Sequence, residues 1–594
     1  MSDYQYPYTD ILFSLNHVAR LERLTPHLAE PLDQELIEAI LSEAGKLSEQ
    51  VIAPLNWSGD QEGSRVENGE VFEPKGYKEM YQAYCDGGWG ALASDVKYGG
   101  QGLPSTIATA VNEGIQAANL AFSLCPLLAH GAIEAIQSHA SDELKDTYIP
   151  KMVTGQWAGT MNLTEPSAGS DLAAIACKAF PNNADLATET YLIKGQKIFI
   201  TWGDHQMSEN IIHLVLARLP DAPAGVKGIS LFIVPKFLLD AEGNPAERND
   251  ISIVSVEHKL GIHAAPTCVM SYGDKTGAIG YLVGEPNDGL KAMFTMMNNA
   301  RQDVGLQGLA ISERAYQQAL QYAKERKQGM KADRSGRAAI IEHPDVLRML
   351  MTMRSQIDAM RSLIYVAAVE NDLSHISKGE EQQAATARTA LLTPIVKGWI
   401  TEQAQEVTSL AIQIHGGMGF IEETGIAQHA RDARILPIYE GTNGIQAIDL
   451  IGRKLLGDNG HAMAALFSEM ENELDGYLDS EKQDNAAKVK DSVEMAKQAT
   501  EKCLSAMKDN PVLGTGLAYS YMMMMGYIIG GWLQVRAQQV STTDESLGDQ
   551  QVNSWQQSAN FYCDHILPRA GYYAKTIEHG QKSVQILNED SFIR

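Results

Sequence analysis

Cysteine is scarce in this chain, which has six cysteines among 594 residues. None of them forms a CxxC pair, and no Cys/His cluster has the spacing of a zinc site. The sequence therefore predicts no metal site. Scattered thiols of this kind are typical of buried cysteines in a reducing compartment.

Positive charge is also in short supply, because 48 Lys and Arg stand against 74 Asp and Glu, for a formal net charge of −26. A field of this sign repels nucleic acid and anionic lipid, so we predict no nucleic-acid partner. Solubility is the simplest explanation of the acidity. The opening segment MSDYQYPYTDILFSL lacks the basic start of a secretory signal and the Arg-rich character of a transit peptide, which predicts a cytoplasmic protein.

One segment, residues 510–535, lacks charge altogether and is long enough to span a bilayer. Its glycines Gly526 and Gly530 have GxxxG spacing, which is typical of closely packed membrane helices. Against insertion stand its five glycines, its Ser and Thr, and the charged helical stretches on either side. We expect a buried helix of a helical bundle, and membrane association is the less favoured alternative.

The spacing of apolar residues divides the chain into helical and β-type regions. Helical spacing runs up to about residue 155, short β-type runs fill the region up to Gly284, and long helical segments follow to the end. A chain of this length is expected to form several domains. The predicted boundaries are 1–35 for an N-terminal segment, 36–155 for an α domain, 156–285 for a β domain, 286–460 for a helical bundle and 461–594 for an added α domain.

The segment ILPIYEGTNGIQAIDLIGRKL, residues 435–455, places a carboxylate among apolar neighbours. Pro437 argues against an unbroken helix, and the Gly-Thr-Asn-Gly run after Glu440 predicts a turn that opens a new helix, with Thr442 or Asn443 as N-cap. The apolar and aromatic neighbours of Glu440 would desolvate its carboxylate and raise its pKa toward the range of a general base. The alternative is a loop glutamate that merely interacts favourably with the helix dipole.

Three further segments have compositions that suit a ligand site. MNLTEPSAGSDL at 161–172 offers small residues for close backbone approach and hydroxyls for hydrogen bonds, although a polar turn is the alternative. It matches neither the Walker pattern nor GxGxxG, so a Rossmann-type site is not indicated there. GQKIFITWGDH at 195–205 places Phe199 and Trp202 on a strand, where aromatics usually belong to the core. QIHGGMGF at 413–420 ends a long helix with paired glycines, for which a C-cap is the ordinary explanation.

Together and in this order, these segments resemble the acyl-CoA dehydrogenase family across residues 40–457. LTEPSAGSD resembles the family's middle-domain signature, KIFIT its second flavin strand, ERKQG and QIHGGMGF its bundle, and RDARILPIYEGTNGIQ its catalytic loop. The flanking parts resemble a long bacterial branch that includes 3-methylmercaptopropionyl-CoA dehydrogenases and some fatty acyl-CoA dehydrogenases. The resemblance implies an α+β multidomain fold with an N-terminal helical domain, a middle antiparallel β-barrel, a C-terminal four-helix bundle and an additional all-α domain.

The resemblance implies FAD-dependent dehydrogenation of an acyl-CoA thioester to the trans-2-enoyl-CoA. Glu440 matches the family's catalytic base, which removes the α proton while the β hydrogen leaves as hydride to flavin N5. The enolate-like species needs hydrogen-bond donors at the thioester oxygen. The resemblance implies that these donors are the Glu440 backbone N–H and a flavin ribityl hydroxyl.

The resemblance also implies which residues bind ligands. Thr201 matches a position near flavin N5, and Arg326 matches an arginine that reaches the FAD of a neighbouring subunit. Arg301 matches a substrate-contacting arginine, for which a solvated helix arginine is the alternative. The residues expected to bind FAD are Met161, Leu163, Thr164, Gly169, Ser170, Phe199, Ile200, Thr201, Arg326, Gln413, Gly416, Gly417 and Thr442. Those expected to bind substrate are Ser170, Asn298, Arg301, Tyr439 and Gly441.

An FAD site shared between subunits implies a homo-oligomer, either a homodimer or a homotetramer. The resemblance implies acyl-CoA as substrate, electron-transfer flavoprotein as acceptor and a place in fatty-acid β-oxidation. Two alternatives share the fold: an acyl-CoA oxidase that uses oxygen, and a DNA-associated flavoprotein of the alkylation response. The latter uses a basic C-terminal surface, whereas residues 461–594 carry 11 Lys and Arg against 18 Asp and Glu, a net charge of −7.

Three features depart from the family's pattern. Phe199 stands where the family often has Trp, and Asn298 stands where it often has Asp. The residues GMKADRSGRAAIIEHP form an insertion after ERKQ. These departures bear on contacts with the CoA and FAD tails and leave the chemistry at Glu440 intact.

Overall fold

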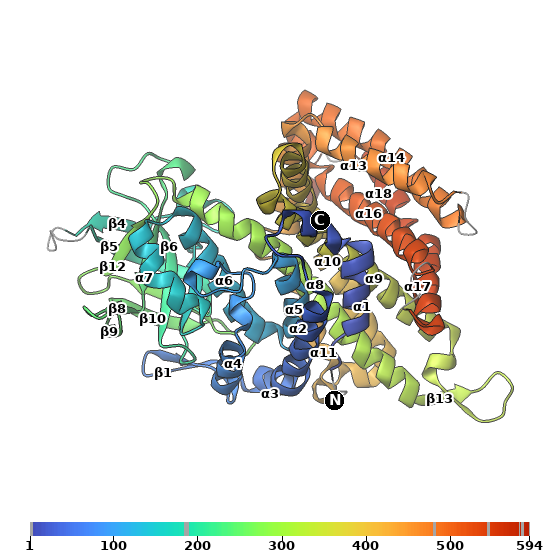
Figure 1. Cartoon of the computed structure of the whole chain (residues 1–594), viewed down its shortest axis with the longest axis horizontal. Coiled ribbons are helices and arrows are strands. Elements are labelled where there is room, and N and C mark those ends of the chain that lie inside the picture. The colour runs from blue at the N-terminus through green and yellow to red at the C-terminus, as the bar shows by residue number, and fades with distance from the viewer. Residues whose placement is uncertain are drawn as a thin grey trace. The chain divides into compact units, whose positions relative to one another are not determined.

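The computed structural model describes residues 4–182, 189–478, 483–542, 547–580, 583, 587 and 589–592. It consists of two compact units, each described here by itself. The sheet unit comprises Lys46–Ala108 and Ala118–Ala300, and the bundle unit comprises Met1–Gly45, Thr109–Ala117 and Arg301–Arg594. Figure 1 follows the chain through its elements from blue to red. The domain boundaries expected from the sequence stay a prediction.

Helices cover part of the sheet unit: α3 (Asn56–Glu62), α4 (Tyr77–Asp86), α6 (Leu120–His139) and α7 (Asp142–Val153). α6 begins where the Asn119 side chain accepts a hydrogen bond from the Phe122 N–H at 3.1 Å, which is a capping contact. It packs so closely on β3 (Trp157–Asn162) that a Cβ at Gly159 would lie 2.8 Å from the Ala132 side chain. Among the described residues, α6 is the helix long and apolar enough to cross a membrane, and 67% of its apolar window is buried.

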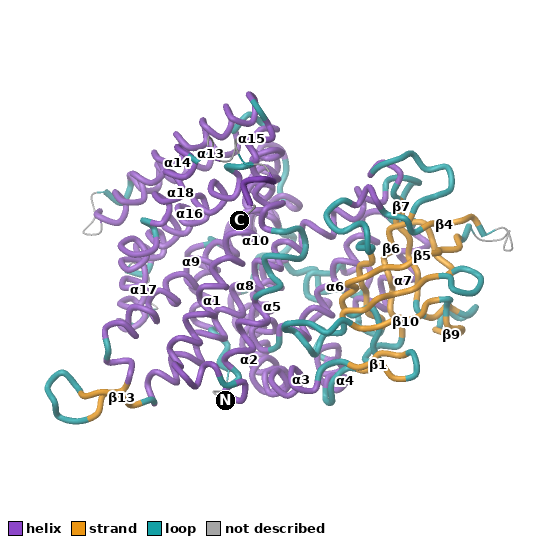
Figure 2. Tube along the Cα trace, turned by 180° about the vertical axis from the view of Figure 1, so that it is seen from behind, coloured by secondary structure: helices purple, strands orange, loops and turns teal. Residues whose placement is uncertain are grey.

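An eight-stranded sheet gives this unit its core, with the order β10-β11-β5-β12-β7-β6-β3 and β4 paired to β5 off this path. Figure 2 shows the strands in orange. Strands β6 and β7 are buried at every position, which explains why their sequences are mostly apolar. The remaining strands of the sheet are β4 (Lys178–Pro181), β5 (Tyr191–Thr201), β6 (Asn210–Ala217), β7 (Ser230–Pro235), β10 (Ile251–Val256), β11 (Thr267–Tyr272) and β12 (Ala278–Val283).

One pair of strands differs from the predicted antiparallel pattern. β3 and β6 run parallel, in register from Trp157↔Asn210 to Asn162↔Val215. A parallel pair requires a crossover of about a dozen residues or more, and the connection 163–209 supplies it with β4 and β5 inside it. Two small antiparallel pairs flank the sheet: β1 (Arg65–Glu67) with β2 (Glu70–Phe72), and β8 (Phe237–Leu239) with β9 (Pro245–Arg248).

Long helices form the bundle unit. They are α8 (Gly289–Glu325), which belongs to this unit from Arg301 on, α9 (Pro344–Ile376) and α10 (Gly379–His415). The shorter elements are α1 (Tyr8–Phe13), α2 (Gln34–Lys46, in this unit up to Gly45), α5 (Ser105–Ala118, in this unit from Thr109 to Ala117), β13 (Lys327–Met330), β14 (Arg337–Ala339), α11 (Ile426–Ala433) and α12 (Asn443–Asp449). Together with the sheet unit, they confirm the predicted fold class of a helical, a β and further helical domains.

The added C-terminal helices pack on this bundle. They are α13 (His461–Asp475), α14 (Gln483–Asp509), α15 (Pro511–Thr515), α16 (Ala518–Val540), α17 (Asp549–Phe561) and α18 (Arg569–His579). The uncharged segment 510–535 is divided between α15 and α16. α16 is buried from Tyr521 to Gln538, which confirms the expectation of a buried helix for this part, whereas Val512 of α15 is exposed. A Cβ at Gly526 would lie 2.1 Å from the Trp399 ring of α10, so this glycine permits the close approach of two helices.

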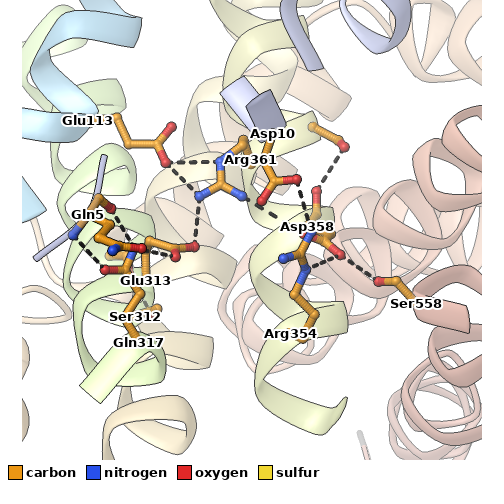
Figure 3. Close-up of polar contacts among 12 residues, drawn as sticks. Gln5, Asp10, Glu113, Ser312, Glu313, Gln317, Arg354, Asp358, Arg361 and Ser558 are labelled. Carbon is orange, nitrogen blue, oxygen red and sulfur yellow. Dashed lines mark hydrogen bonds and ion pairs between the residues drawn. The ribbon is translucent and has the colours of Figure 1, made fainter. Parts of the chain in front are cut away.

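A buried guanidinium joins three helices of the bundle unit (Figure 3). Arg361 of α9 lies 2.7 Å from Glu113 of α5 and 2.9 Å from Glu313 of α8, and all three side chains are buried. The Tyr365 hydroxyl donates a further hydrogen bond to Glu113 at 2.5 Å. Burial raises the pKa of Glu113, and Arg361 opposes that rise.

A second group of polar contacts joins α9 to α1 near the N-terminus and to α17 of the added domain. Arg354 lies 3.1 Å from Asp10 of α1 and 2.9 Å from Asp358, one helical turn further along α9. The Ser558 hydroxyl of α17 donates to the same Asp358 carboxylate at 2.6 Å. Polar contacts on α9 therefore hold the N-terminal segment and the added domain in the same unit (Figure 3).

Candidate active site

Glu440 lies in the short loop between α11 and α12 of the bundle unit. The Thr442 hydroxyl accepts a hydrogen bond from the Ile445 N–H at 3.3 Å, so Thr442 is the N-cap of α12 and the predicted turn is confirmed. Glu440 has a φ of 55°, a left-handed conformation that residues other than glycine rarely adopt, and Gly441 follows at 84°. Backbone strain of this kind concentrates at functional sites.

Two basic side chains influence the Glu440 carboxylate, namely Arg301 of α8 and Lys397 of α10. Glu440 is half-buried, and the loss of water around its carboxylate raises its pKa, while Arg301 and Lys397 oppose the rise. The pKa remains above its ordinary value, as its apolar neighbours in the sequence predict. A carboxylate with a raised pKa is a stronger base than one in free solution.

Arg301 is not the solvated helix arginine that the sequence left as an alternative, because its side chain is only 8% exposed. Burial lowers its pKa, whereas Asp449 and Glu440 raise it. A guanidinium stays protonated even when buried. Arg301 therefore supplies a fixed positive charge near Glu440.

Tyr439 and Gly441 flank the carboxylate on either side. The Tyr439 hydroxyl donates a hydrogen bond to Oε1 of Gln307 on α8. The Gln446 side chain donates to the carbonyl oxygen of Glu440 at 3.1 Å, and a Cβ at Gly441 would lie 2.8 Å from that Gln446 amide. Side chains of α8 and α12 thus hold the loop, and Gly441 leaves no room for a larger residue.

The other FAD residues predicted in this unit lie where α8 and α10 end. Tyr322 of α8 stacks on His415 of α10 with ring centroids 4.2 Å apart, which brings the two helix ends together. Gly416 ends α10 at a φ of 60°, and a Cβ at Gly416 or Gly417 would meet nothing within 4 Å. We call the predicted FAD residues at these two helix ends the helix-end group. All of them are exposed: Arg326, Gln413, Gly416 and Gly417.

The helix-end group is far from Glu440 within one chain. Lys397 and His415 are 415 − 397 = 18 positions apart on α10, and this spacing corresponds to about 27 Å along a helix axis. Lys397 contacts the loop that contains Glu440, and His415 lies at the helix ends, so the two residues give the positions of the two groups along α10. The bundle unit therefore carries two separate groups of predicted site residues.

In the sheet unit, the LTEPSAGSD and KIFIT segments lie side by side. The Ile198 N–H donates to the Thr164 carbonyl at 2.9 Å, and the Thr160 hydroxyl donates to the Thr201 carbonyl at 2.8 Å. Lys197 forms a buried ion pair with Glu165 of the other segment. The structure thus brings together the two segments of the sheet unit whose residues are predicted to bind FAD: Met161, Leu163, Thr164, Gly169, Ser170, Phe199, Ile200 and Thr201.

Phe199 and Trp202, the two aromatic residues of this segment, differ in burial. Trp202 is buried and its ring N–H donates to the Ala121 carbonyl at 3.0 Å, so the core interpretation holds for it. Phe199 is 58% exposed and has a φ of 59°, so the core interpretation is wrong for it. An exposed aromatic ring held in a strained backbone suits a planar ligand better than a core. The Asn298 side chain lies outside the described part of the structure.

Sequence reasoning missed Lys197 and Lys397. Both are buried lysines, and each contacts a segment that the sequence had singled out. The sequence feature that could have indicated Lys397 is a single lysine in an otherwise apolar stretch, PIVKGWI. Buried lysines are rare unless they are paired, so such a residue merits attention.

Comparison with protein families matches the chain from residue 35 to residue 587 in four domains. The N-terminal domain of acyl-CoA dehydrogenase matches residues 35–156, its middle domain 160–274 and its C-terminal domain 287–456. An acetyl-CoA dehydrogenase C-terminal-like domain matches residues 466–587. The chain belongs to the acyl-CoA dehydrogenase family and is an enzyme that acts on CH–CH groups.

Similar proteins extend over nearly the whole chain. A 3-methylmercaptopropionyl-CoA dehydrogenase of Ruegeria pomeroyi is 46% identical over 538 residues, which are 89% of this chain and 90% of that protein. A broad-specificity linear acyl-CoA dehydrogenase of Mycobacterium tuberculosis is 33% identical and covers 100% of both chains. An acyl-CoA dehydrogenase of Bacillus anthracis, solved with FAD, is 20% identical with a TM-score of 0.73, over 94% of this chain and 90% of that one.

Enzymes of this family are FAD-dependent, so FAD is the cofactor of this chain. The described residues of the sheet unit fit such a group. Phe199 presents an exposed ring, and a Cβ at Gly169 would meet nothing within 4 Å, which leaves room for close approach to the backbone. Thr164 and Thr201 are half-buried beside them and offer hydroxyl groups.

Proposed function

We propose that this enzyme removes one hydrogen from the α carbon and one from the β carbon of an acyl-CoA thioester, giving the trans-2-enoyl-CoA, with Glu440 as the base. The observation that carries the proposal is the half-buried Glu440 carboxylate, held at a φ of 55° near Arg301 and Lys397. A desolvated carboxylate on a strained backbone, near two basic side chains, has the properties of a general base.

Glu440 takes the α proton onto its carboxylate, and the electrons of the broken C–H bond pass into an enolate-like thioester. The low polarity around Glu440 favours its neutral form, so protonation removes a buried charge. The backbone N–H of Glu440 is proposed as a donor to the thioester oxygen, where negative charge develops. When bound, FAD supplies the acceptor for the β hydrogen and its two electrons.

The cofactor is proposed to lie on the sheet-unit residues around Phe199. The hydroxyls of Thr164, Ser170 and Thr201, in the two segments that lie side by side, are the proposed hydrogen-bond donors to it. The helix-end group is proposed to serve the FAD of a second copy. The separation of about 27 Å along α10 supports this, because one chain then contributes to two sites.

The substrate class is proposed to be acyl-CoA thioesters, with Arg301, Tyr439 and Gly441 as contacts beside the base. Ser170 and Asn298 remain proposed contacts from the sheet unit. The names of the two relatives supply the two candidate substrate types, a 3-methylmercaptopropionyl thioester and linear acyl thioesters. The proposed electron acceptor is an electron-transfer flavoprotein.

Anaerobic mixing of the FAD-loaded protein with acyl-CoAs from butyryl to stearoyl, and with 3-methylthiopropionyl-CoA, tests the proposal. We expect loss of flavin absorbance with at least one of them and a 2-enoyl-CoA as product. No bleaching with any of these thioesters would overturn the proposal. Release of peroxide in air, without added acceptor, would show that oxygen, and not an electron-transfer flavoprotein, is the electron acceptor.

A further inference from the structure

We propose that Lys397 is a positioning residue for Glu440, because its buried ammonium group fixes the backbone that follows the base. The inference rests on the proposed function, in which Glu440 removes the α proton. Lys397 lies on α10 and its side chain is fully buried. Its hydrogen bonds run to Gly441 and Asn443, so its role is exerted through the loop.

The contacts of Lys397 run directly to the loop. Its Nζ donates to the carbonyl oxygen of Gly441 at 2.8 Å and to Oδ1 of Asn443 at 2.9 Å. The Asn443 amide in turn donates to Oγ1 of Thr401 at 3.0 Å and to a carboxylate oxygen of Glu402 at 2.8 Å. One turn of α10 therefore holds the first residues after Glu440 at several points.

The loop needs such anchors because two consecutive residues, Glu440 and Gly441, have left-handed backbones. Glycine adopts this conformation freely, but glutamate does so only when its surroundings impose it. The Glu440 carbonyl is held by Gln446 and the Gly441 carbonyl by Lys397. Both peptide groups after the base are thus fixed, which sets the direction of the carboxylate.

A cation is suited to this position, although burying an ammonium group is costly. Burial lowers the pKa of Lys397 to about 7, Glu440 and Glu402 oppose that shift, and Arg301 adds to it. Of these groups, Glu440 lies in the loop, Glu402 on α10 and Arg301 on α8. Lys397 also lowers the pKa of Glu440. Removal of the ammonium group must therefore raise the pKa of the base, as well as loosen the loop.

The test is Lys397→Met in the full-length, FAD-loaded protein, because methionine keeps an unbranched chain and removes the donors. We expect the rate of flavin reduction to fall at least about 10-fold at an unchanged KM, since small misplacements of a catalytic group have large effects. We also expect the acid limb of the pH–rate profile to move to higher pH. Hydrogen exchange of residues 437–446 should become faster.

Lys236→Met is the matched control, because it also removes a buried lysine, paired with Asp204 at 2.6 Å in the sheet unit. It should lower thermal stability while the acid limb stays in place. A merely structural role for Lys397 would give the same result as Lys236→Met. A wild-type rate and an unmoved acid limb in Lys397→Met would overturn the inference.

Asn443→Ala decides the matter if Lys397→Met does not fold. This variant keeps the ammonium group and removes one of its two acceptors, so we expect a smaller loss of rate, faster exchange of residues 437–446 and an unmoved acid limb. A wild-type rate together with wild-type exchange would contradict the inference. Glu440→Gln, measured in parallel, separates the two proposals: if it reduces flavin at the wild-type rate, the proposed function itself fails.

Discussion

The ammonium group of Lys197 lies 2.8 Å from a carboxylate oxygen of Glu165, and both side chains are buried. Glu165 also accepts the backbone N–H of Ala176 at 2.6 Å, and Lys197 also donates to the carbonyl of Leu163 at 3.0 Å. The pair therefore joins strand β5 to the turn after β3. These are the two segments proposed to hold FAD in the sheet unit.

Glu165→Gln should release FAD and destabilise the protein, because Lys197 would remain buried without its counter-charge. Breaking one partner of a buried ion pair costs about 3–5 kcal/mol. Thermal unfolding and the fluorescence of released flavin measure both effects. Glu247→Gln, at an exposed position of the same unit, should change neither. Full retention of FAD by Glu165→Gln would show that the pair is not needed for binding.

Glu440→Gln should retain FAD and lose most of its activity, because the amide cannot accept the α proton. The usual contribution of a general base predicts a rate of flavin reduction about 10² to 10⁴ lower. Stopped-flow absorbance under anaerobic conditions measures this rate. Glu423→Gln, at an exposed position before α11, should behave as the wild type. An unimpaired Glu440→Gln variant would remove Glu440 from the role of base.

The same Glu440→Gln variant should be more heat-stable than the wild type at neutral pH. The folded-state pKa of Glu440 is raised, so the stabilisation from its neutral form is present below its unfolded pKa and is lost as the pH rises through the folded pKa. Glutamine mimics the neutral form at every pH. The difference in Tm should therefore shrink toward about pH 4, near the ordinary glutamate pKa. A constant difference across this range would contradict the pKa shift.

The rate of flavin reduction should also depend on the ionisation of Glu440. Because the base acts only when it is ionised, the rate should fall as the pH falls through the raised pKa of Glu440. The acid limb for flavin reduction should therefore lie above about 4.3, the value of an unperturbed glutamate. A pH–rate profile with an acyl-CoA whose acyl chain carries no ionisable group measures it. An acid limb at or below the unperturbed value would refute this expectation.

Arg361→Met should destabilise the bundle unit strongly, because Glu113 and Glu313 would share a buried region without the guanidinium between them. The expected loss in the free energy of unfolding is about 3–5 kcal/mol. Arg348→Met on the same helix is the control, since its ion pair with Asp345 is exposed and should contribute about 0–1 kcal/mol. Chemical denaturation compares the two, and equal losses would argue against a special role for the buried network.

The sequence predicted the Glu440 loop well because the information is local. Thr442 and the glycines around it determine where α12 begins, and the apolar neighbours already indicate a raised pKa for Glu440. The buried helix α16 was also predictable, because glycines and polar residues interrupt its apolar run. Such features depend on residues that are adjacent in the chain.

The anchors of the site could not be predicted in the same way. Lys397 precedes Gly441 by 44 positions and Lys197 follows Glu165 by 32, so neither contact leaves a local pattern. The parallel pairing of β3 with β6 likewise depends on how a long connection returns to the sheet. The roles of the individual site residues remain predictions, and the variants above test them.

Gly526 of α16 lies against Trp399, two residues beyond Lys397 on α10. The added domain thus buries one face of α10, the helix that anchors the proposed base. A chain shortened before α13 would leave the Trp399 face of α10 in water, two positions along the helix from the lysine that holds the Glu440 loop. We therefore expect a form of this enzyme without the added domain to carry a polar side chain on that face of α10.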